Sequence, residues 1–378
     1  MAAYLDHAAT TKPAECVIQA ITDCLTNHYG NPSSLHRVGL DAELQMNRAR
    51  AIIAEAIGAD AKEILFTSGA TESSNLAIRG ACAAYGKRRK HIITSAVEHA
   101  SVRSTIDALE EEGFQVTRIL PDANGVFHAE DFICAVTEDT CLVSMMLAEN
   151  ETGRILPVQD VFRRIKKKHP YVILHCDAVQ AFMKLPVDVR DMPADLMSLS
   201  AHKIHGPKGV GALYIRKGTR LIPRTTGGHQ EQGIRPGTEA VPLICGFGAA
   251  VQWMKPTVTQ RRAHVTALHE KLLASLSSME DIRINSDPEG SPYIVNFSVK
   301  GIRSEIMLHF LEEREIYVSS GSACSKGARS GVLSAYGIPD NLADCAIRVS
   351  FSGETTEEEL NMLVQAVKDG QSTLIHKH

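Results

Sequence analysis

A lysine follows a short apolar run near the middle of the chain. Residues 196–199 predict a buried strand, and Ser200-Ala201-His202-Lys203 comes next, before a turn of glycine and proline. The Lys203 amine could form a Schiff base with a carbonyl group, while the Ser200 hydroxyl and the His202 imidazole hold an anionic group beside it. The alternative is an ordinary surface lysine, because most lysines are exposed. The interpretation therefore depends on whether the chain supplies the other parts of such a site.

Small residues connect a predicted strand at 64–67 to the start of a helix. This stretch contains Ala70 and Thr71. Free backbone N–H groups and the helix dipole favour an anion such as a phosphate group at this position. A plain helix start, in which Thr71 and Glu72 only support the first turn, is the alternative.

A carboxylate follows another predicted strand, at 172–176. Asp177 would cost free energy at the end of a buried strand unless it were paired. The protonated pyridine nitrogen of pyridoxal phosphate (PLP) is a suitable partner, and Gln180 could bond the ring hydroxyl. A metal site at His175, Cys176 and Asp177 is the alternative, but successive strand residues point to opposite faces and cannot converge on one ion.

Two more polar turns follow predicted strands, and ligands of open α/β sheets collect at such strand ends. His99 follows the strand at 91–94, where an imidazole could stack on a planar ring and move protons. A half-buried structural histidine is the alternative. Asn150 follows the strand at 140–146 and could offer its amide to the ring or to a substrate.

One of the nine cysteines, Cys324, lies among serines and glycines, with Lys326 and Arg329 close by. An exposed thiol near cations has a lowered pKa and is a nucleophile. An incidental loop cysteine is the alternative. The odd number of cysteines and the lack of a CxxC pair argue against a disulfide framework and against a thiolate zinc site. We therefore expect no metal.

Strands and helices alternate along the first two-thirds of the chain, which predicts an α/β fold with a mostly parallel sheet covered on both faces. The composition changes near Trp253, and an α+β pattern follows. A chain of 378 residues exceeds the usual size of one core. We predict a large domain at 14–255 and a smaller domain formed by 1–13 and 256–378, which carries the Cys324 loop.

Composition narrows the class of protein. The formal net charge of −4 gives no electrostatic argument for DNA or another nucleic acid as the main partner. No apolar run approaches the roughly 20 residues that cross a bilayer, so we expect no membrane span. The first residues lack the basic and apolar regions of a signal peptide. A cytoplasmic enzyme is expected.

Together these segments resemble the cysteine desulfurases of the NifS/IscS branch, in the class V aminotransferase family of PLP enzymes. The resemblance extends from residue 4 to about residue 352, in the order found in the family. The matching segments are YLDHAATT, GNPSSLH, FTSGATESSNLAI, VEHASV, ENETG, CDAVQ, SAHKIHGPKG, GIRPGTEAV, SSGSACSKG and AIRVSFS. The resemblance implies PLP fold type I, with a seven-stranded sheet in the large domain.

The resemblance also implies roles for the residues that bind the cofactor. Lys203 matches the lysine that bonds to PLP, Asp177 the partner of the pyridine nitrogen, and His99 the imidazole stacked on the ring. Gln180 and Asn150 match contacts to the ring and substrate. The residues that match phosphate ligands are Ala70, Thr71, Ser200 and His202, together with Thr238, which the other subunit of a homodimer supplies.

The implied reaction converts L-cysteine to L-alanine. Arg348 matches the residue that pairs with the substrate carboxylate, and Cys324 matches the nucleophile that takes the sulfur as a persulfide. The persulfide would then serve iron–sulfur cluster assembly, tRNA thiolation or another acceptor. A selenocysteine lyase and a PLP-dependent aminotransferase are the alternatives on the same fold.

The sequence departs from the family pattern near its C-terminus. The stretch after Cys324 is shorter than usual and lacks a Leu-Glu-Pro sequence. Only a short helix is expected after Glu357, without the tail that docks the iron–sulfur scaffold protein in some relatives. That partnership is therefore not assumed.

Overall fold

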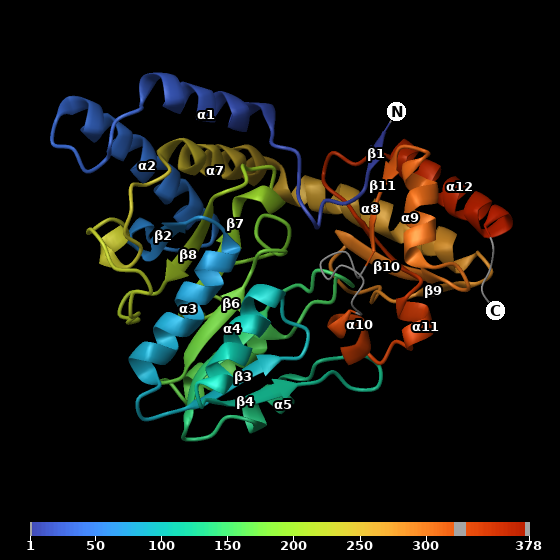
Figure 1. The fold of residues 1–378 in the computed structure, drawn as a ribbon, viewed down its shortest axis with the longest axis horizontal. Coiled ribbons are helices and arrows are strands. Elements are labelled where there is room, and N and C mark those ends of the chain that lie inside the picture. The colour runs from blue at the N-terminus through green and yellow to red at the C-terminus, as the bar shows by residue number, and fades with distance from the viewer. Residues whose placement is uncertain (1, 321–329, 375–378) are drawn as a thin grey trace.

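A seven-stranded sheet forms the centre of the larger part of the protein (Figure 1). The computed structural model describes residues 2–320 and 330–374. β8 runs antiparallel to both of its neighbours, and the other pairs are parallel, which confirms the predicted sheet. The strands in spatial order are β2 (Ile64–Thr67), β8 (Gly211–Ile215), β7 (Leu196–Ser200), β6 (Ile173–Asp177), β5 (Thr140–Met146), β3 (His91–Ser95) and β4 (Gln115–Ile119).

Helices cover both faces of this sheet because its central strands are apolar on both sides. One face packs against α3 (Ala70–Tyr85) and α4 (Ala100–Glu111), through buried residues such as Leu76 and Ile106. The other face carries most of the core. The helices that cover it are α1 (Glu15–Asn27), α2 (Arg37–Ala56), α5 (Ala129–Cys134), α6 (Val158–Lys168) and α7 (Val241–Met254).

A second, antiparallel sheet has its own core, in which Phe297 and Val349 are fully buried. Its strands in spatial order are β12 (Ser319–Ser320), β13 (Ala346–Ser350), β10 (Ile294–Val299) and β9 (Ile282–Ile284). Its helices are α8 (Val258–Ser277), α9 (Ser304–Glu312), α10 (Gly331–Ala335), α11 (Asp340–Ala343) and α12 (Glu357–Thr373).

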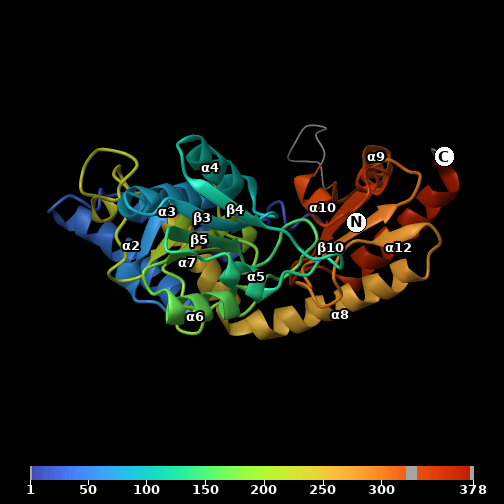
Figure 2. The same cartoon turned by 90° about the horizontal axis from the view of Figure 1, so that it is seen from below.

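Two segments join the parts. α8 follows closely after α7 of the large part and extends along the second sheet (Figure 2). The N-terminal segment begins as β1 (Ala3–Tyr4), which pairs in parallel with β11 (Ile316–Tyr317), and then crosses to the large sheet, where the Thr11 N–H donates to the His202 carbonyl at 2.9 Å. The assignment of 14–255 to one domain, and of 1–13 with 256–378 to another, stays a prediction.

Two details of the helix starts differ from simple capping rules. α2 begins after His36, whose Nδ1 accepts the Gly39 N–H at 3.2 Å, so its cap is an imidazole. Ser33 does not cap it, because the helix begins only at Arg37, four residues further on. Among the helices that the structure describes, none is long and apolar enough to cross a membrane.

Candidate active site

A cavity of about 760 Å³ lies where the carboxyl ends of the large sheet meet the N-terminal segment and the second sheet. This size suits a small ligand. The cavity brings together nearly all of the residues predicted from the sequence: Ala70, Thr71, His99, Asn150, Asp177, Gln180, Ser200, His202, Lys203 and Arg348. Thr238 is exposed and does not line the cavity. Cys324 lies outside the described residues.

Lys203 is placed by a single 3₁₀ turn that follows β7. Its Nζ donates to the carbonyl oxygens of Ala8 at 2.5 Å and Ala9 at 2.8 Å. Both carbonyls belong to the N-terminal segment, almost 200 residues away along the chain. The amine therefore takes its position from tertiary contacts as well as from the end of its own strand.

Asp177 is the last residue of β6 and is 5% exposed. Its Oδ1 accepts the Val179 N–H at 3.0 Å. Burial raises the pKa of the Asp177 carboxyl, while the nearby His99 and Lys203 act in the opposite direction. A buried carboxylate of this kind is stabilised when a cation binds next to it.

His99 precedes α4 and caps it. Its Nδ1 accepts the Ser101 N–H at 3.2 Å, so the neutral ring carries its proton on Nε2. The side chain is open to the cavity, yet many protein atoms surround it, and this desolvation lowers the pKa of the imidazole, although Asp177 acts against the shift. The ring is therefore expected to be neutral at pH 7.

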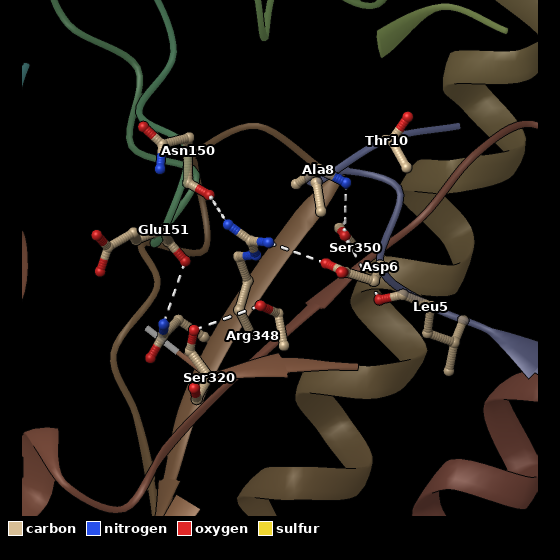
Figure 3. Close-up of polar contacts among 12 residues, drawn as sticks. Leu5, Asp6, Ala8, Thr10, Asn150, Glu151, Ser320, Arg348 and Ser350 are labelled. Carbon is tan, nitrogen blue, oxygen red and sulfur yellow. Dashed lines mark hydrogen bonds and ion pairs between the residues drawn. The ribbon is translucent and has the colours of Figure 1, made fainter. Parts of the chain in front are cut away.

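Arg348 on β13 connects three parts of the chain at the cavity (Figure 3). Its Nη1 donates to the Asn150 carbonyl at 3.0 Å, and its Nη2 donates to Asp6 Oδ1 at 2.9 Å. The side chain is 6% exposed, and its Nε has no hydrogen-bond partner among the described residues. This leaves a buried cationic donor at the cavity.

Ser200 and the start of α3 offer donors at the other end of the cavity. The Ser200 Oγ is buried and has no partner among the described residues. α3 begins at Ala70 without a side-chain cap, and the first N–H groups of a helix have no intrahelical acceptor. β8 approaches closely there, since a Cβ on Gly211 would lie 2.7 Å from the Gly69 carbonyl carbon.

A comparison with known protein families identifies the family of this chain. The model of the family described as aminotransferase class-V matches residues 3–363. The chain belongs to the class V aminotransferase family. Enzymes of this family depend on PLP.

Relatives within this family are similar over almost the whole chain. A mitochondrial cysteine desulfurase of Saccharomyces cerevisiae is 42% identical over 97% of this chain and 74% of its own length. A solved structure of a NifS-like protein is 37% identical, with a TM-score of 0.93, and the match covers 99% of this chain and 100% of that one. A structure described as SspA in complex with cysteine is 34% identical, with a TM-score of 0.81, over 93% of this chain and 99% of that one.

The residues of this class V aminotransferase fit the cofactor of the family. Ser200 Oγ is a buried donor that no described residue pairs with, and the N–H groups of α3 lie at the same cavity, as a phosphate group requires. Asp177 is a buried carboxylate, as a protonated ring nitrogen requires. His202 has a pKa lowered to about 4, chiefly by burial and then by Lys203, so its imidazole is neutral at pH 7.

Several residues at this site were missed by sequence reasoning. Asp6 and the Ala8 carbonyl belong to a matching segment, but nothing in that segment indicates that they contact Arg348 and Lys203. Lys184 is 4% exposed, and its Nζ donates to Gln180 Oε1 at 3.3 Å. A lysine inside an apolar run was the signal that could have found it.

Glu98 and His175 are buried next to the site and were given no cofactor role. Glu98 Oε1 accepts the Met146 N–H at 2.9 Å, and its Oε2 has no partner among the described residues. The His175 ring lies between Ser144 and Ser198, at 2.8 and 2.9 Å. Within 2–320 and 330–374, no group of three or more His, Cys, Asp or Glu side chains could hold a metal ion.

Proposed function

We propose that this protein is a PLP-dependent cysteine desulfurase, which converts L-cysteine to L-alanine and takes the sulfur onto Cys324 as a persulfide. One observation carries the proposal: Lys203, Asp177 and Arg348 line a single cavity. The three groups suit an amine-reactive aldehyde, a ring nitrogen and an amino acid carboxylate. The cysteine desulfurases among the relatives, and the relative solved with cysteine, support the choice of substrate.

In this proposal the cofactor is held at two ends. The start of α3, Ser200 and His202 bind the phosphate group, and Asp177 pairs with the ring nitrogen. Gln180 contacts the ring hydroxyl, and its amide is already oriented because Oε1 accepts from Lys184 while Nε2 donates to the Ala8 carbonyl at 3.0 Å. Bound PLP supplies an electron sink that makes the Cα proton of an attached amino acid acidic.

Residues of this chain then orient the substrate and move its protons. Arg348 binds the substrate carboxylate, with Asn150 beside it, and this fixes the direction of the side chain that carries the sulfur. The Lys203 amine takes the Cα proton. His99 holds a proton at Nε2, because its Nδ1 is occupied by the Ser101 N–H, and can donate it at the cavity.

The sulfur step needs a nucleophile. The Cys324 thiolate bonds to the substrate sulfur as the substrate Cβ–S bond breaks. In the overall balance, L-cysteine and the Cys324 thiol give L-alanine and a Cys324 persulfide. The sulfur is oxidised and the substrate Cβ is reduced, so no external oxidant or reductant is required.

A homodimer forms part of the proposal. Thr238 would bind the phosphate group in the site of a second copy, and its exposure outside the cavity of its own chain is compatible with that role. The N-terminal helices also present an apolar surface of the kind that packs against a partner. Its exposed side chains are Leu25, Tyr29, Leu35, Leu40 and Leu44.

The sulfur acceptor and the compartment are also proposed. A protein persulfide can be passed on to another thiolate, as iron–sulfur cluster assembly or tRNA thiolation requires. We place the enzyme in the cytoplasm, although the relatives include mitochondrial enzymes.

The test measures alanine and sulfide from L-cysteine under reducing, oxygen-free conditions. Cys324→Ala should abolish both products, while Cys134→Ala, an exposed cysteine away from the cavity, should retain them. Mass spectrometry should find one added sulfur on Cys324 before reductant is added. Full activity of Cys324→Ala would refute this sulfur step.

The same variants separate the alternatives. A selenocysteine lyase would release selenide from selenocysteine without Cys324 and would act poorly on L-cysteine. An aminotransferase would depend on an added 2-oxo acid.

A further inference from the structure

An exposed segment between β8 and α7 contains one buried carboxylate. Residues 223–229 and Thr238 are exposed, whereas Glu231 is 7% exposed. The glycines of this stretch favour flexibility. A buried carboxylate in such a segment indicates that its conformation matters.

Glu231 forms a paired contact with Arg50 on α2. Arg50 Nη1 and Nη2 donate to the two carboxylate oxygens at 2.9 and 2.6 Å, and the side chains of Arg50 and Glu231 are 13% and 2% exposed. Such a two-point pairing fixes orientation as well as distance. We call this contact the Arg50–Glu231 clamp.

The clamp also completes the edge of the large sheet. β2 is an edge strand, so its outward backbone groups lack a neighbouring strand. The Phe66 N–H donates to Glu231 Oε2 at 2.8 Å, and Arg50 Nη1 donates to the Ile64 carbonyl at 2.6 Å. The clamp therefore attaches the exposed segment to the edge strand of the large sheet.

The backbone at the clamp has an uncommon conformation. Glu231 and Gln232 have φ angles of 45° and 60°, and Gly233 follows at 71°. Positive φ is unfavourable for residues other than glycine and persists where surrounding contacts impose it. The clamp supplies those contacts.

Among the described residues, the clamp makes no direct contribution to the cavity of the same chain. Neither Arg50 nor Glu231 lines the cavity, and neither does Thr238, seven residues beyond Glu231. α2, which carries Arg50, also exposes Leu40 and Leu44 on the apolar surface described above. The clamp thus connects the segment to a helix expected to meet a second copy.

We infer that the Arg50–Glu231 clamp positions residues 227–238 for the active site of a second copy of this chain, so that it acts in trans. This inference rests on the proposed homodimer and on the proposed phosphate contact of Thr238. Arg50 and Glu231 are positioning residues, since neither touches the cofactor or the substrate.

Alternatively, the clamp would affect the active site of its own chain. Arg235 in the same segment pairs with Glu72 at 3.0 Å, and Glu72 lines the cavity and accepts the Ser68 N–H at 2.6 Å. Loss of the clamp could therefore disturb the start of α3 of the same chain. The experiment has to separate action in trans from action in cis.

Mixed dimers make this separation. Two chains with different tags are co-expressed, and dimers that contain both are purified. In the trans dimer, a wild-type chain is paired with a chain that carries Glu231→Gln and Lys203→Ala. In the cis dimer, a Glu231→Gln chain is paired with a Lys203→Ala chain. The reference pairs wild type with Lys203→Ala.

The readout is the rate of PLP release after dilution. It is monitored by the visible absorbance of bound PLP that requires Lys203. Each dimer therefore reports only the site that retains Lys203. We expect PLP to leave the trans dimer about tenfold faster than the reference, the effect of weakening one hydrogen bond to a charged group. We expect the cis dimer to match the reference. Faster release only from the cis dimer, equal release from both, or no change in either would overturn the inference.

Controls keep the outcome interpretable. Glu55→Gln on the same helix removes an exposed pair with Lys255 and should change nothing. Arg50→Lys replaces Glu231→Gln if that variant does not fold, because it keeps the charge but loses the two-point contact. If the protein sediments as a monomer, both the action of the clamp in trans and the homodimer would be refuted. The desulfurase chemistry is judged separately, by alanine and sulfide formation.

Discussion

Arg348 Nη2 and Asp6 Oδ1 lie 2.9 Å apart, although 342 positions separate the two residues along the chain. This pair connects the N-terminal segment to the second sheet close to Ala8 (Figure 3). The Ala8 carbonyl in turn accepts from Lys203. The proposed carboxylate-binding group and the proposed cofactor-binding lysine thus depend on the same short segment.

Arg348→Lys should weaken substrate binding more than it slows the chemistry. A lysine keeps the charge but cannot contact Asp6, the Asn150 carbonyl and a substrate carboxylate at once. We expect the KM for L-cysteine to rise about tenfold, with a smaller change in kcat. Steady-state alanine formation measures both, and an unchanged KM would contradict the role given to Arg348.

Ser200→Ala should have opposite effects on the free protein and on the cofactor complex. The buried hydroxyl has no partner among the described residues, so its removal should raise the free energy of unfolding of the PLP-free protein by about 1 kcal/mol. The same change removes a phosphate donor, and the Kd for PLP should rise about tenfold. Urea unfolding and PLP titration provide the two values. A fall in both the free energy of unfolding and the affinity for PLP would show that Ser200 is structural.

Glu98→Gln should reduce the dependence of stability on pH. Burial raises the pKa of Glu98 to about 8, from an ordinary value of 4.5. Between these values the folded protein binds a proton that the unfolded chain has lost. The free energy of unfolding therefore falls as pH rises through this window, by at most about 1.4 kcal/mol per pH unit from this group.

Urea unfolding of the PLP-free protein at several pH values between 4.5 and 8 tests this. The wild type should lose more stability across the window than Glu98→Gln. Parallel curves for the two proteins would mean that Glu98 is ionised in the folded state.

Lys184→Met should stabilise the fold and impair the cofactor site. Burial, with Lys203 and Arg348 nearby, lowers the pKa of Lys184 to about 7. Between pH 7 and the ordinary pKa of 10.5, the unfolded chain holds a proton that the folded protein has lost. The free energy of unfolding of the wild type therefore rises with pH in this window, and that of the variant lacks this rise. At pH 6, replacing the buried cation should stabilise the PLP-free protein by on the order of 1 kcal/mol.

Affinity for PLP should fall in the same variant, because the Gln180 amide loses the donor that orients it. Thermal unfolding without PLP and titration with PLP separate the two effects. Lys184→Arg, which keeps the charge, is the matched control. An unchanged Kd for PLP in Lys184→Met would remove Lys184 from the site.

The sequence by itself determined which residue types stand at the ends of the strands. Asp177 and Ser200 stand at the ends of β6 and β7, and His99 lies between β3 and α4, where the local patterns predicted polar residues after strands. Apolar runs and turn residues act over a few positions, so they specify strands, turns and helix starts. The parallel order of the sheet then brings these ends to one edge.

Only the tertiary structure decided which groups complete the site. The Ala8 carbonyl at Lys203 and Asp6 at Arg348 are brought there by a segment that pairs with the second sheet. Glu231 reaches Arg50 across 181 positions. Such contacts depend on how separate elements pack, and local periodicity holds no information on which distant side chain will meet a buried charge.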